Sequence, residues 1–398
     1  MLTKTQLERY ADVLVWGLKT AREKTFKKGE IVLVRYDRGA ESLAERLQAR
    51  FLDRGLHVVL RAGLTCEMER QFFEKANTPQ LVFQAPGEKQ LYDALNGGIY
   101  LYAPESLTHL RHIDPKKIAR AAVARKPLRD ILDRREEKGL FGWSLCMVPT
   151  PALAKHAGLT LKQYTHQVVR ACYLDAKDPV GQWKAVYKRA VQLKKRINAL
   201  DVSYYRVQSR HMDLKITPGA RRRWVGISGH NIPSFEIFLS PDWRGTEGIF
   251  FADQPSFRNG NDVREVRLTF KKGKLIRIEA KKGRDFIRKQ LAMDPGASRV
   301  GEFSLTDRRF SRINKFMANT LFDENFGGRF GNCHIAMGAS YSDTYDGNPK
   351  ALTAARKKAL GFNDSALHWD LVNTEKKTVT ARLSSGEDVV VYKDGIFI

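Results

Sequence analysis

Hydrophobic residues in the first hundred positions follow two alternating patterns. Short apolar runs have the length and composition of buried strands. They lie at residues 31–36, 57–62, 81–84 and 98–104. Between the runs, at 40–54, 67–75 and 87–96, apolar residues recur every three or four positions, as on one face of a helix. This alternation predicts a mostly parallel sheet with helices flanking it.

Longer helices are predicted on both sides of this pattern. Residues 3–24 form an amphipathic stretch, and Thr5 with Glu8 has the spacing of a capping box at its start. The stretch 178–200 is the clearest later helix, because its apolar residues recur every three or four positions and lysine and arginine occupy much of the remaining surface. We therefore expect residues 1–200 to form an amino-terminal α/β domain with a helical extension.

After about residue 202 the pattern changes to short strand-like runs separated by glycine, proline and asparagine. These runs include 204–209, 213–217, 222–228, 235–240 and 248–253. Residues 263–281 and 378–398 are typical of hairpins, and helices are expected near 283–293 and 348–360. The second half, residues 201–398, is thus predicted to be an α+β domain with a largely antiparallel sheet.

Length and composition agree with two packed domains. The chain has 398 residues, of which 42% are hydrophobic, and domains typically contain ~100–200 residues. No apolar run approaches the ~18–20 residues that cross a bilayer, and no signal sequence precedes the first helix. The four cysteines stand far apart without a CxxC pair, as in proteins of a reducing cytosol, so we expect a cytoplasmic location. No glycine-rich phosphate-binding motif is present.

The net charge of +25 is unusually basic. Residues 1–230 carry +19 of it and residues 231–398 carry +6, with excess basic residues mainly at 116–129, at 184–196 and around the turn at 271–284. Such a surface can attract nucleic acid, membrane headgroups or acidic peptides. The simpler interpretation is a solubilising surface, because the charges are interspersed with apolar residues at helical spacing.

His368 and Asp370 stand two residues apart in the segment SALHWDLV. On a strand both side chains would point to the same face, because the side-chain period of a strand is two. An imidazole and a carboxylate on one face can bind one metal ion or two neighbouring ions. Taken alone the pair indicates little, since most such pairs are surface or structural contacts.

Three further residues with metal-binding side chains lie in the same half. Glu236 and Glu302 each stand as the single acid on an otherwise apolar run, and His334 lies in NCHIAMGASY. Either glutamate alone is better explained as a strand-end residue facing water or as a partner of an arginine. Together with the His-x-Asp pair, the set suits two divalent ions ~3.5–4 Å apart with a bridging carboxylate. A mixed carboxylate–imidazole set favours Zn, Co or Mn.

Several segments together resemble the aminopeptidase T / aminopeptidase S family of dinuclear metallopeptidases. The opening LERYADVLV…KKGEIVLVRYD resembles the family's amino-terminal domain, and WSLCMVPTPALAKHAGLTLKQY resembles its central helical signature. The segments NIPSFEIFLSP, GEFSL, NTLFDEN, CHIAMGASY and SALHWDLV are similar to its catalytic domain, and the closing DGIFI to its final hairpin. The likeness runs almost from end to end.

The resemblance implies that six residues surround two divalent metal ions, which would be Zn, Co, Mn or Mg. The six are Glu236, Glu302, His334, Tyr341, His368 and Asp370. In this interpretation Glu302 is the bridging or base-like carboxylate, and Tyr341 is a ligand or an oxyanion stabiliser. Glu324, in LFDENF, is expected to lie just outside the set and to support the ligands.

The same resemblance implies a cytosolic aminopeptidase that removes amino-terminal residues from peptides by two-metal hydrolysis. One metal ion would bind the free α-amine of the substrate, and the other would polarise the scissile carbonyl. A homodimer is also implied, with active sites that face an enclosed cavity and thus admit short peptides.

Two alternatives remain open. A metal-dependent hydrolase of another amide substrate would use the same site residues. A nucleic-acid-binding protein on a peptidase fold would explain the basic charge, although no zinc finger, helix-turn-helix or aromatic RNA-binding motif is visible. Phe235, Leu239 and the glycine-rich segment 326–332 depart from the family pattern, which leaves the side-chain specificity open.

Overall fold

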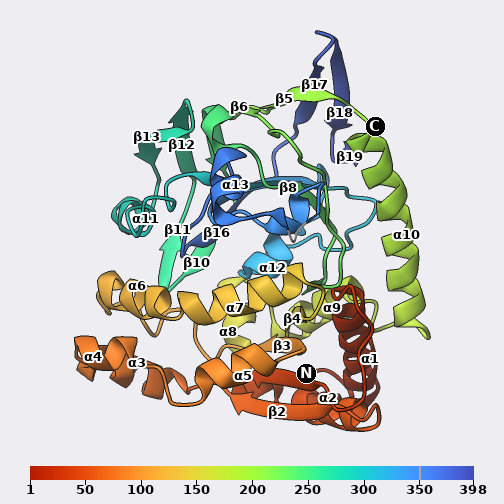
Figure 1. Ribbon diagram of the computed structural model, residues 1–398, viewed down its shortest axis with the longest axis vertical. Helices are drawn as coiled ribbons and strands as arrows, with labels where there is room; N and C mark the ends of the chain where they lie inside the picture. Colours follow the sequence, from red (N-terminus) through yellow and green to blue (C-terminus); the bar gives the residue numbers. More distant parts are fainter. Residues whose placement is uncertain (349–350) are drawn as a thin grey trace. The chain divides into compact units, whose positions relative to one another are not determined.

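The computed structural model describes residues 1–348 and 351–398 (Figure 1). The chain divides into two compact units. Unit 1 contains Met1–Tyr187 and Ile227–Ser234, and unit 2 contains Lys188–Gly226 and Phe235–Ile398. Within the described residues, no helix is both long enough and apolar enough to cross a membrane.

Unit 1 is built on a five-stranded sheet with the order β2-β1-β3-β4-β7, in which every pair of neighbours is parallel. Its strands are β1 (Ile31–Tyr36), β2 (His57–Ala62), β3 (Gly97–Tyr102), β4 (Gly142–Met147) and β7 (Asn231–Ile232). The first three coincide with apolar runs that predict strands. The parallel α/β architecture expected for the first half is therefore confirmed.

Helices alternate with these strands along the chain (Figure 1). They are α1 (Lys4–Thr20), η1 (Arg38–Ala40), α2 (Glu41–Leu52), α3 (Cys66–Lys75), α4 (Thr78–Val82), α5 (Glu88–Ala94), α6 (Pro115–Ala124), α7 (Lys126–Glu137), α8 (Pro151–His156), α9 (Leu161–Ala171) and α10 (Pro179–Asn198). The Tyr10 hydroxyl on α1 donates a hydrogen bond to the carbonyl oxygen of Met147 on β4 at 3.0 Å. This buried contact ties the first helix to the sheet.

The strand predicted at 81–84 is wrong, because the chain is already helical there. Thr78–Val82 forms α4, whose start is capped by Asn77. The Asn77 side chain accepts from the backbone N–H of Gln80, and the Gln80 side chain accepts from that of Asn77. Leu81 is the buried residue of α4, so a short capped helix places the apolar side chain inward without a strand.

The capping box of α1 lies two residues earlier than predicted. Thr3 and Gln6 form it, in place of Thr5 and Glu8. The helix begins at Lys4, so Thr3 is the residue with extended backbone whose side chain can reach back to the first turn.

Unit 2 contains two antiparallel sheets and a small ribbon. The larger sheet has the order β13-β12-β9-β6-β5-β17-β18-β19, and the smaller has the order β16-β15-β14-β8. The strands of the larger sheet are β5 (Val202–Gln208), β6 (Asp213–Ile216), β9 (Glu247–Ala252), β12 (Val266–Lys271), β13 (Lys274–Glu279), β17 (Thr378–Leu383), β18 (Asp388–Lys393) and β19 (Ile396–Phe397). Those of the smaller sheet are β8 (Glu236–Leu239), β14 (Val300–Thr306), β15 (Asn332–Gly338) and β16 (His368–Asn373). The antiparallel α+β architecture predicted for the second half is confirmed.

The remaining elements of unit 2 are short. They are the ribbon strands β10 (Ser256–Arg258) and β11 (Asn261–Val263), with α11 (Arg284–Leu291), α12 (Thr320–Asp323), α13 (Ala354–Ala359), η2 (Trp243–Gly245) and η3 (Ser342–Thr344). Both predicted hairpins are present, as β12–β13 and β17–β18. The helix expected near 348–360 is the shorter α13, and residues 349–350 of that prediction lie outside the described residues.

The strand predicted at 222–228 is wrong. Among the described residues, this run forms only isolated bridges at Arg222 and Val225. Arg221, directly before the run, and Ile227, near its end, have left-handed backbone conformations with φ of 59° and 52°. A strand needs extended backbone throughout, so these two residues limit the pairing to single positions.

The central strands of the smaller sheet are enclosed along their whole length. Every residue of β14 and of β15 is buried. A charged side chain on either strand is therefore kept from water, which is costly unless hydrogen bonds or opposite charges surround it. This enclosure sets the chemistry of the site described next.

Candidate metal centre

The register of the smaller sheet brings ionisable residues from separate strands to one face. Glu302 on β14 lies opposite Ala336 on β15, and Ala336 lies opposite Asp370 on β16. Directly opposite residues point to the same face of a sheet, so Glu302 and Asp370 share a face. His334 is two residues before Ala336 and points the same way.

The first group of possible metal ligands surrounds His334. Its Nε2 atom lies 3.2 Å from Oε2 of Glu236 on β8 and 3.1 Å from Oε1 of Glu302. All three side chains are buried. Each can offer one ligand atom, and these atoms lie within 4.8 Å of one another. The geometry is that of donors arranged around one small cation.

The second group combines Glu302 with the His-x-Asp pair. His368 Nε2 lies 3.4 Å from Oδ1 of Asp370 and 3.9 Å from Oε2 of Glu302. The ligand atoms of this group also lie within 4.8 Å of one another. Both members of the pair lie on β16 and face the site, in the arrangement expected for a strand.

Glu302 belongs to both groups, and its two oxygens face different histidines. Oε1 is the atom nearest to His334, and Oε2 is the atom nearest to His368. A carboxylate that directs one oxygen to each group has the arrangement of a bridging ligand in a two-metal site. Nδ1 of His368 lies 3.0 Å from the carbonyl oxygen of Ala339, and an N–H there leaves the Nε2 lone pair free for a ligand role.

Tyr341 lies beside these two groups. Its ring centroid is 4.8 Å from that of His368, and its backbone N–H donates to Oγ of Ser240 at 2.8 Å. Tyr341 is 39% exposed as a whole, but desolvation of its hydroxyl, followed by the negative charges of Glu302 and Asp370, raises the pKa of that hydroxyl well above its usual value. The hydroxyl is therefore kept as a hydrogen-bond donor.

Glu324 follows α12 directly and is also buried. Burial raises the pKa of its carboxyl well above the ordinary value, and the charges of Glu236 and Asp370 raise it further. The structure thus places Glu324 within electrostatic reach of the predicted ligands but outside both groups of three. A carboxyl in such a position favours its proton-bound form.

Protonation shows how unbalanced the charges of the cluster are without a cation. Burial raises the pKa of Glu302 to about 7, although the hydrogen bond with His334 opposes the shift. Burial alone would lower the pKa of His368, but the charge of Asp370 outweighs it and raises the pKa to about 9. Burial alone would also lower the pKa of His334, but its hydrogen bonds with Glu236 and Glu302 outweigh burial and raise that pKa well above the usual value. The imidazoles therefore hold their protons and supply positive charge beside the carboxylates.

The donor set fits divalent metal ions. Four carboxylates, those of Glu236, Glu302, Glu324 and Asp370, share a largely enclosed space with two imidazoles. Two imidazoles carry at most two positive charges, so the cluster has an excess of negative charge that metal cations would balance. Mixed oxygen and imidazole ligands suit borderline cations such as zinc rather than a cysteine-based structural site.

Two supporting residues were not predicted from the sequence. Ser304, two residues after Glu302 on β14, donates from Oγ to Oε2 of Glu236 at 3.3 Å. Arg258 on β10 donates from Nη1 to the carbonyl oxygen of His368 at 3.0 Å. The period-two spacing from Glu302 is the signal that could have indicated Ser304, whereas Arg258 is distant in sequence and carried no local signal.

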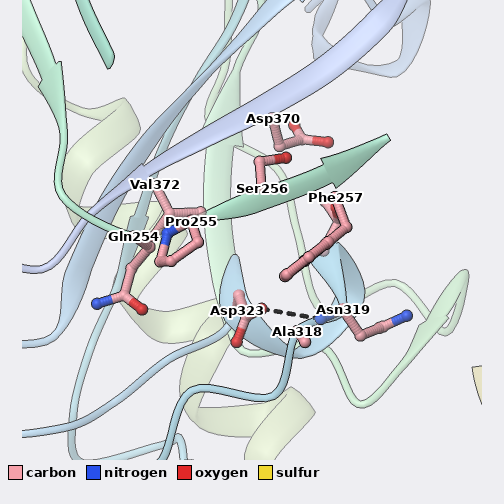
Figure 2. A pocket seen from close by; sticks show the side chains of 10 residues that line it. Gln254, Pro255, Ser256, Phe257, Ala318, Asn319, Asp323, Asp370 and Val372 are labelled. Atoms are coloured by element: carbon pink, nitrogen blue, oxygen red, sulfur yellow. Dashed lines mark hydrogen bonds between the residues drawn. The ribbon is translucent and has the colours of Figure 1, made fainter. Parts of the chain in front are cut away.

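A small cavity borders Asp370 on the side of β10 and α12 (Figure 2). Its volume of about 10 Å³ is close to the least that holds one water molecule. Asp323 lines it and accepts from the backbone N–H groups of Met317 and Asn319 at 2.7 and 2.9 Å. Burial raises the pKa of the Asp323 carboxyl to about 8. The cavity is too small for a substrate side chain.

Fold and site together define a two-unit α/β protein with an enclosed cluster of carboxylates and imidazoles suited to divalent metal ions. The profile of the thermophilic metalloprotease (M29) family matches residues 3–397, and the chain belongs to this family of peptide-bond hydrolases.

Relatives named as aminopeptidases agree with this membership. The chain is 27% identical over 310 residues to Aminopeptidase 2 of Geobacillus stearothermophilus, a match that covers 72% of each protein. It is 26% identical over 314 residues to Aminopeptidase T of Thermus aquaticus, covering 73% of each. The solved structure of wild-type AmpT from Thermus thermophilus has the same fold, with a TM-score of 0.79, 21% identity and 99% coverage of both chains.

Proposed function

We propose that the protein is an aminopeptidase that removes amino-terminal residues from peptides by two-metal hydrolysis. The single observation that carries the proposal is the position of Glu302, whose two oxygens face two separate groups of ligand atoms. The choice of an aminopeptidase over another amide hydrolase is supported by the relatives, which are named aminopeptidases.

The proposed ligands divide into two sets that share one residue. Glu236 and His334 would hold one ion, His368 and Asp370 would hold the other, and Glu302, which belongs to both groups, would take part in both sites. Bound ions of this kind act as Lewis acids and lower the pKa of a bound water to about 7. Zn, Co and Mn suit the donor set best, and Mg, which prefers oxygen ligands, suits it less.

The other residues of the site are proposed to hold protons and orient ligands. The Tyr341 hydroxyl, whose pKa is raised, donates a hydrogen bond to the oxyanion that forms from the scissile carbonyl. Glu324, whose pKa is also raised, carries a proton at the edge of the ligand set and supports the ligands. Ser304 donates to Oε2 of Glu236, the oxygen that lies near His334, and thereby orients this carboxylate within the ligand set.

Three further features belong to the same proposal. We assign the catalytic metal-binding role to residues 201–398, most of which lie in unit 2, and the amino-terminal domain to residues 1–200, most of which lie in unit 1. A cytoplasmic location is supported by the four cysteines, all of which are free thiols. A homodimer stays a prediction that rests on the family resemblance, and its direct test is the mass of the protein in solution by light scattering.

The test of the proposed function is release of free amino acids from matched peptides with free and acetylated amino termini. The metal-depleted enzyme is reloaded with Zn, Co, Mn or Mg, and His368→Ala is compared with His57→Ala, an exposed histidine on β2 in unit 1. We expect cleavage of free peptides alone, its loss in His368→Ala and its retention in His57→Ala. Cleavage of acetylated peptides, or equal activity of both variants, would contradict the proposal.

A further inference from the structure

A long basic stretch of unit 2 lies at one end of its larger sheet. Residues 264–289 contain eleven lysines and arginines against three acidic residues, a net charge of +8. The whole of residues 231–398 carries +6, so the remainder of that half is slightly acidic. Peptide hydrolysis at the metal centre uses none of these basic residues. Their concentration therefore needs a separate explanation.

The same stretch contains an unpaired sheet edge. β13 is the last strand of the larger sheet, and among residues 1–348 and 351–398 it pairs with β12 alone. An edge strand presents N–H and C=O groups that can pair with another extended chain. Ile276 lies at an irregularity in the register of this pair and is 60% exposed.

A hollow of about 430 Å³ runs along this edge. It is lined by residues 275–279 of β13 and by Arg284 and Arg288 of α11. Successive side chains of a strand point to opposite faces, so a hollow that touches five consecutive residues follows the edge itself. Its volume lies within the ~300–1,000 Å³ usual for ligand sites. Three arginines and one glutamate face it, because Arg277 and Glu279 belong to the β13 part of the lining.

We propose that this edge binds an acidic extended peptide segment of a partner protein, which adds to β13 as a further strand. The main chain of the segment would pair with the strand edge, and its carboxylates would pair with Arg277, Arg284 and Arg288, bidentately where the geometry allows. Arg277 now contacts Glu279 at 2.9 Å and Arg288 contacts Asp285 at 3.4 Å. Both pairs are exposed and worth little, so a ligand can replace them.

A second copy of this chain fits the edge poorly. Pairing of two copies at this edge would bring the basic stretch 264–289, with a net charge of +8, of one copy against the same stretch of the other, and like charges brought together at an interface are destabilising. Single-stranded nucleic acid also fits poorly, because no aromatic ring lines the hollow on which a base could stack. Charge and the exposed backbone edge together favour an acidic peptide.

The test measures fluorescence anisotropy of a labelled, amino-terminally acetylated peptide of alternating aspartate and valine. Acetylation blocks removal of its first residue, so binding is separated from hydrolysis. The comparison probes are the same peptide with N-methylated valines, a lysine–valine peptide and an oligothymidylate, all at ~0.15 M salt, where non-specific binding is weak. N-methylation keeps the charge and removes strand pairing.

Two double variants with the same change in net charge separate the site from the general field of the protein. R284E/R288E alters the hollow, whereas K188E/R189E alters exposed residues of α10. We expect the aspartate–valine peptide to bind, R284E/R288E to weaken binding at least tenfold, and K188E/R189E to change it less than twofold. Peptidase activity should be unchanged in both variants, so this result is independent of the proposed function.

Three outcomes would overturn the proposal: equal loss in both double variants, equally tight binding of the N-methylated peptide, or tighter binding of the oligothymidylate. Either of the first two outcomes would mean that the peptide binds through the general positive charge of the protein and not by pairing with β13. The third would assign the basic edge to nucleic acid. Thermal melts of both variants ensure that the comparison is made between folded proteins.

Discussion

The two sheets of unit 2 differ in where they place charged side chains, which are buried in the smaller sheet and exposed at one end of the larger. The smaller sheet gathers carboxylates and imidazoles around two central strands, β14 and β15, whose residues are all buried, whereas the β12–β13 end of the larger sheet exposes lysines and arginines to water. Arg277 and Glu279 form an ion pair with side chains 68% and 43% exposed, while His334 and Glu302 meet with 0% and 4% exposed. The difference teaches that burial, more than residue type, decides what a charged group costs and what it can do.

The strongest way to break this comparison is to remove one glutamate charge from each sheet. Glu302→Gln on β14 removes the oxygen charge shared by both ligand groups. We expect kcat/KM for free peptides to fall by roughly 10³-fold, since loss of ~4 kcal/mol of metal-dependent stabilisation corresponds to that factor.

The matched control is Glu279→Gln on β13, which removes the same charge from an exposed pair. Its activity should stay within twofold of the wild type. Comparable losses in the two variants would mean that burial in the smaller sheet has no special role in catalysis.

The second prediction concerns pH in the metal-free protein. The folded-state pKa of Glu302 is raised to about 7 and that of His368 to about 9. A raised pKa contributes stability below the unfolded-state value, and this stability is lost as pH rises through the folded-state value. Unfolding free energy should therefore fall between pH 4.5 and pH 9, by roughly 3 kcal/mol for each of the two shifts of about 2.5 pKa units.

Urea unfolding in EDTA at pH 5.5, 7 and 9 measures this loss, and addition of Zn or Mn should restore stability at pH 9. Asp370 has the opposite sign, because His368 lowers its pKa against the effect of burial. Its contribution is lost only as pH falls below about 4, outside this window. Metal-free protein that becomes more stable from pH 5.5 to pH 9 would refute the electrostatic account of the cluster.

A smaller effect is expected from the hydroxyl that supports Glu236. Ser304→Ala removes the donor to Oε2 of Glu236 and leaves every ligand in place. Metal affinity should fall by ~10-fold, as is typical when a supporting hydrogen bond is lost. Calorimetric titration of metal-depleted protein measures it, with Ser203→Ala on β5, an exposed serine hydroxyl, as the control. Equal metal affinities of Ser304→Ala and the wild type would contradict this prediction and would mean that Ser304 contributes only to packing.

The smallest effect sharpens the comparison from the exposed side. Arg277→Ala removes one partner of the Arg277–Glu279 pair on β13. Exposed pairs contribute ~0.2–1 kcal/mol, so unfolding free energy in urea should change by less than about 1 kcal/mol. A loss above ~2 kcal/mol would show that this end of the larger sheet depends on its charges for stability.

Most of the architecture could be predicted from the period of the hydrophobic pattern. The parallel strands β1, β2 and β3 and the hairpin β12–β13 follow directly from it. Two strand predictions were wrong, for local reasons that the hydrophobic period does not reveal. The apolar run at 81–84 overlaps the short helix α4, which begins after the cap at Asn77. The run at 222–228 is interrupted by left-handed residues near its two ends.

The site shows the same division between local and long-range information. His368 and Asp370 are linked by period two within one strand. Glu236, Glu302 and His334 were noted as metal-binding side chains in the same half, and the family resemblance added Tyr341 and joined all six into one site. Arg258 had no such signal, because its bond to the carbonyl oxygen of His368 joins residues 110 positions apart. Such a contact between residues far apart in the sequence depends on how the strands are arranged in space, and the register of the whole sheet decides that arrangement.

The most direct test of the central claim is an anomalous diffraction map of crystals grown with cobalt or zinc. The account predicts two metal peaks ~3.5–4 Å apart, with the carboxylate of Glu302 between them, His334 beside one and His368 beside the other. A single peak, or two peaks that Glu302 does not join, would contradict it.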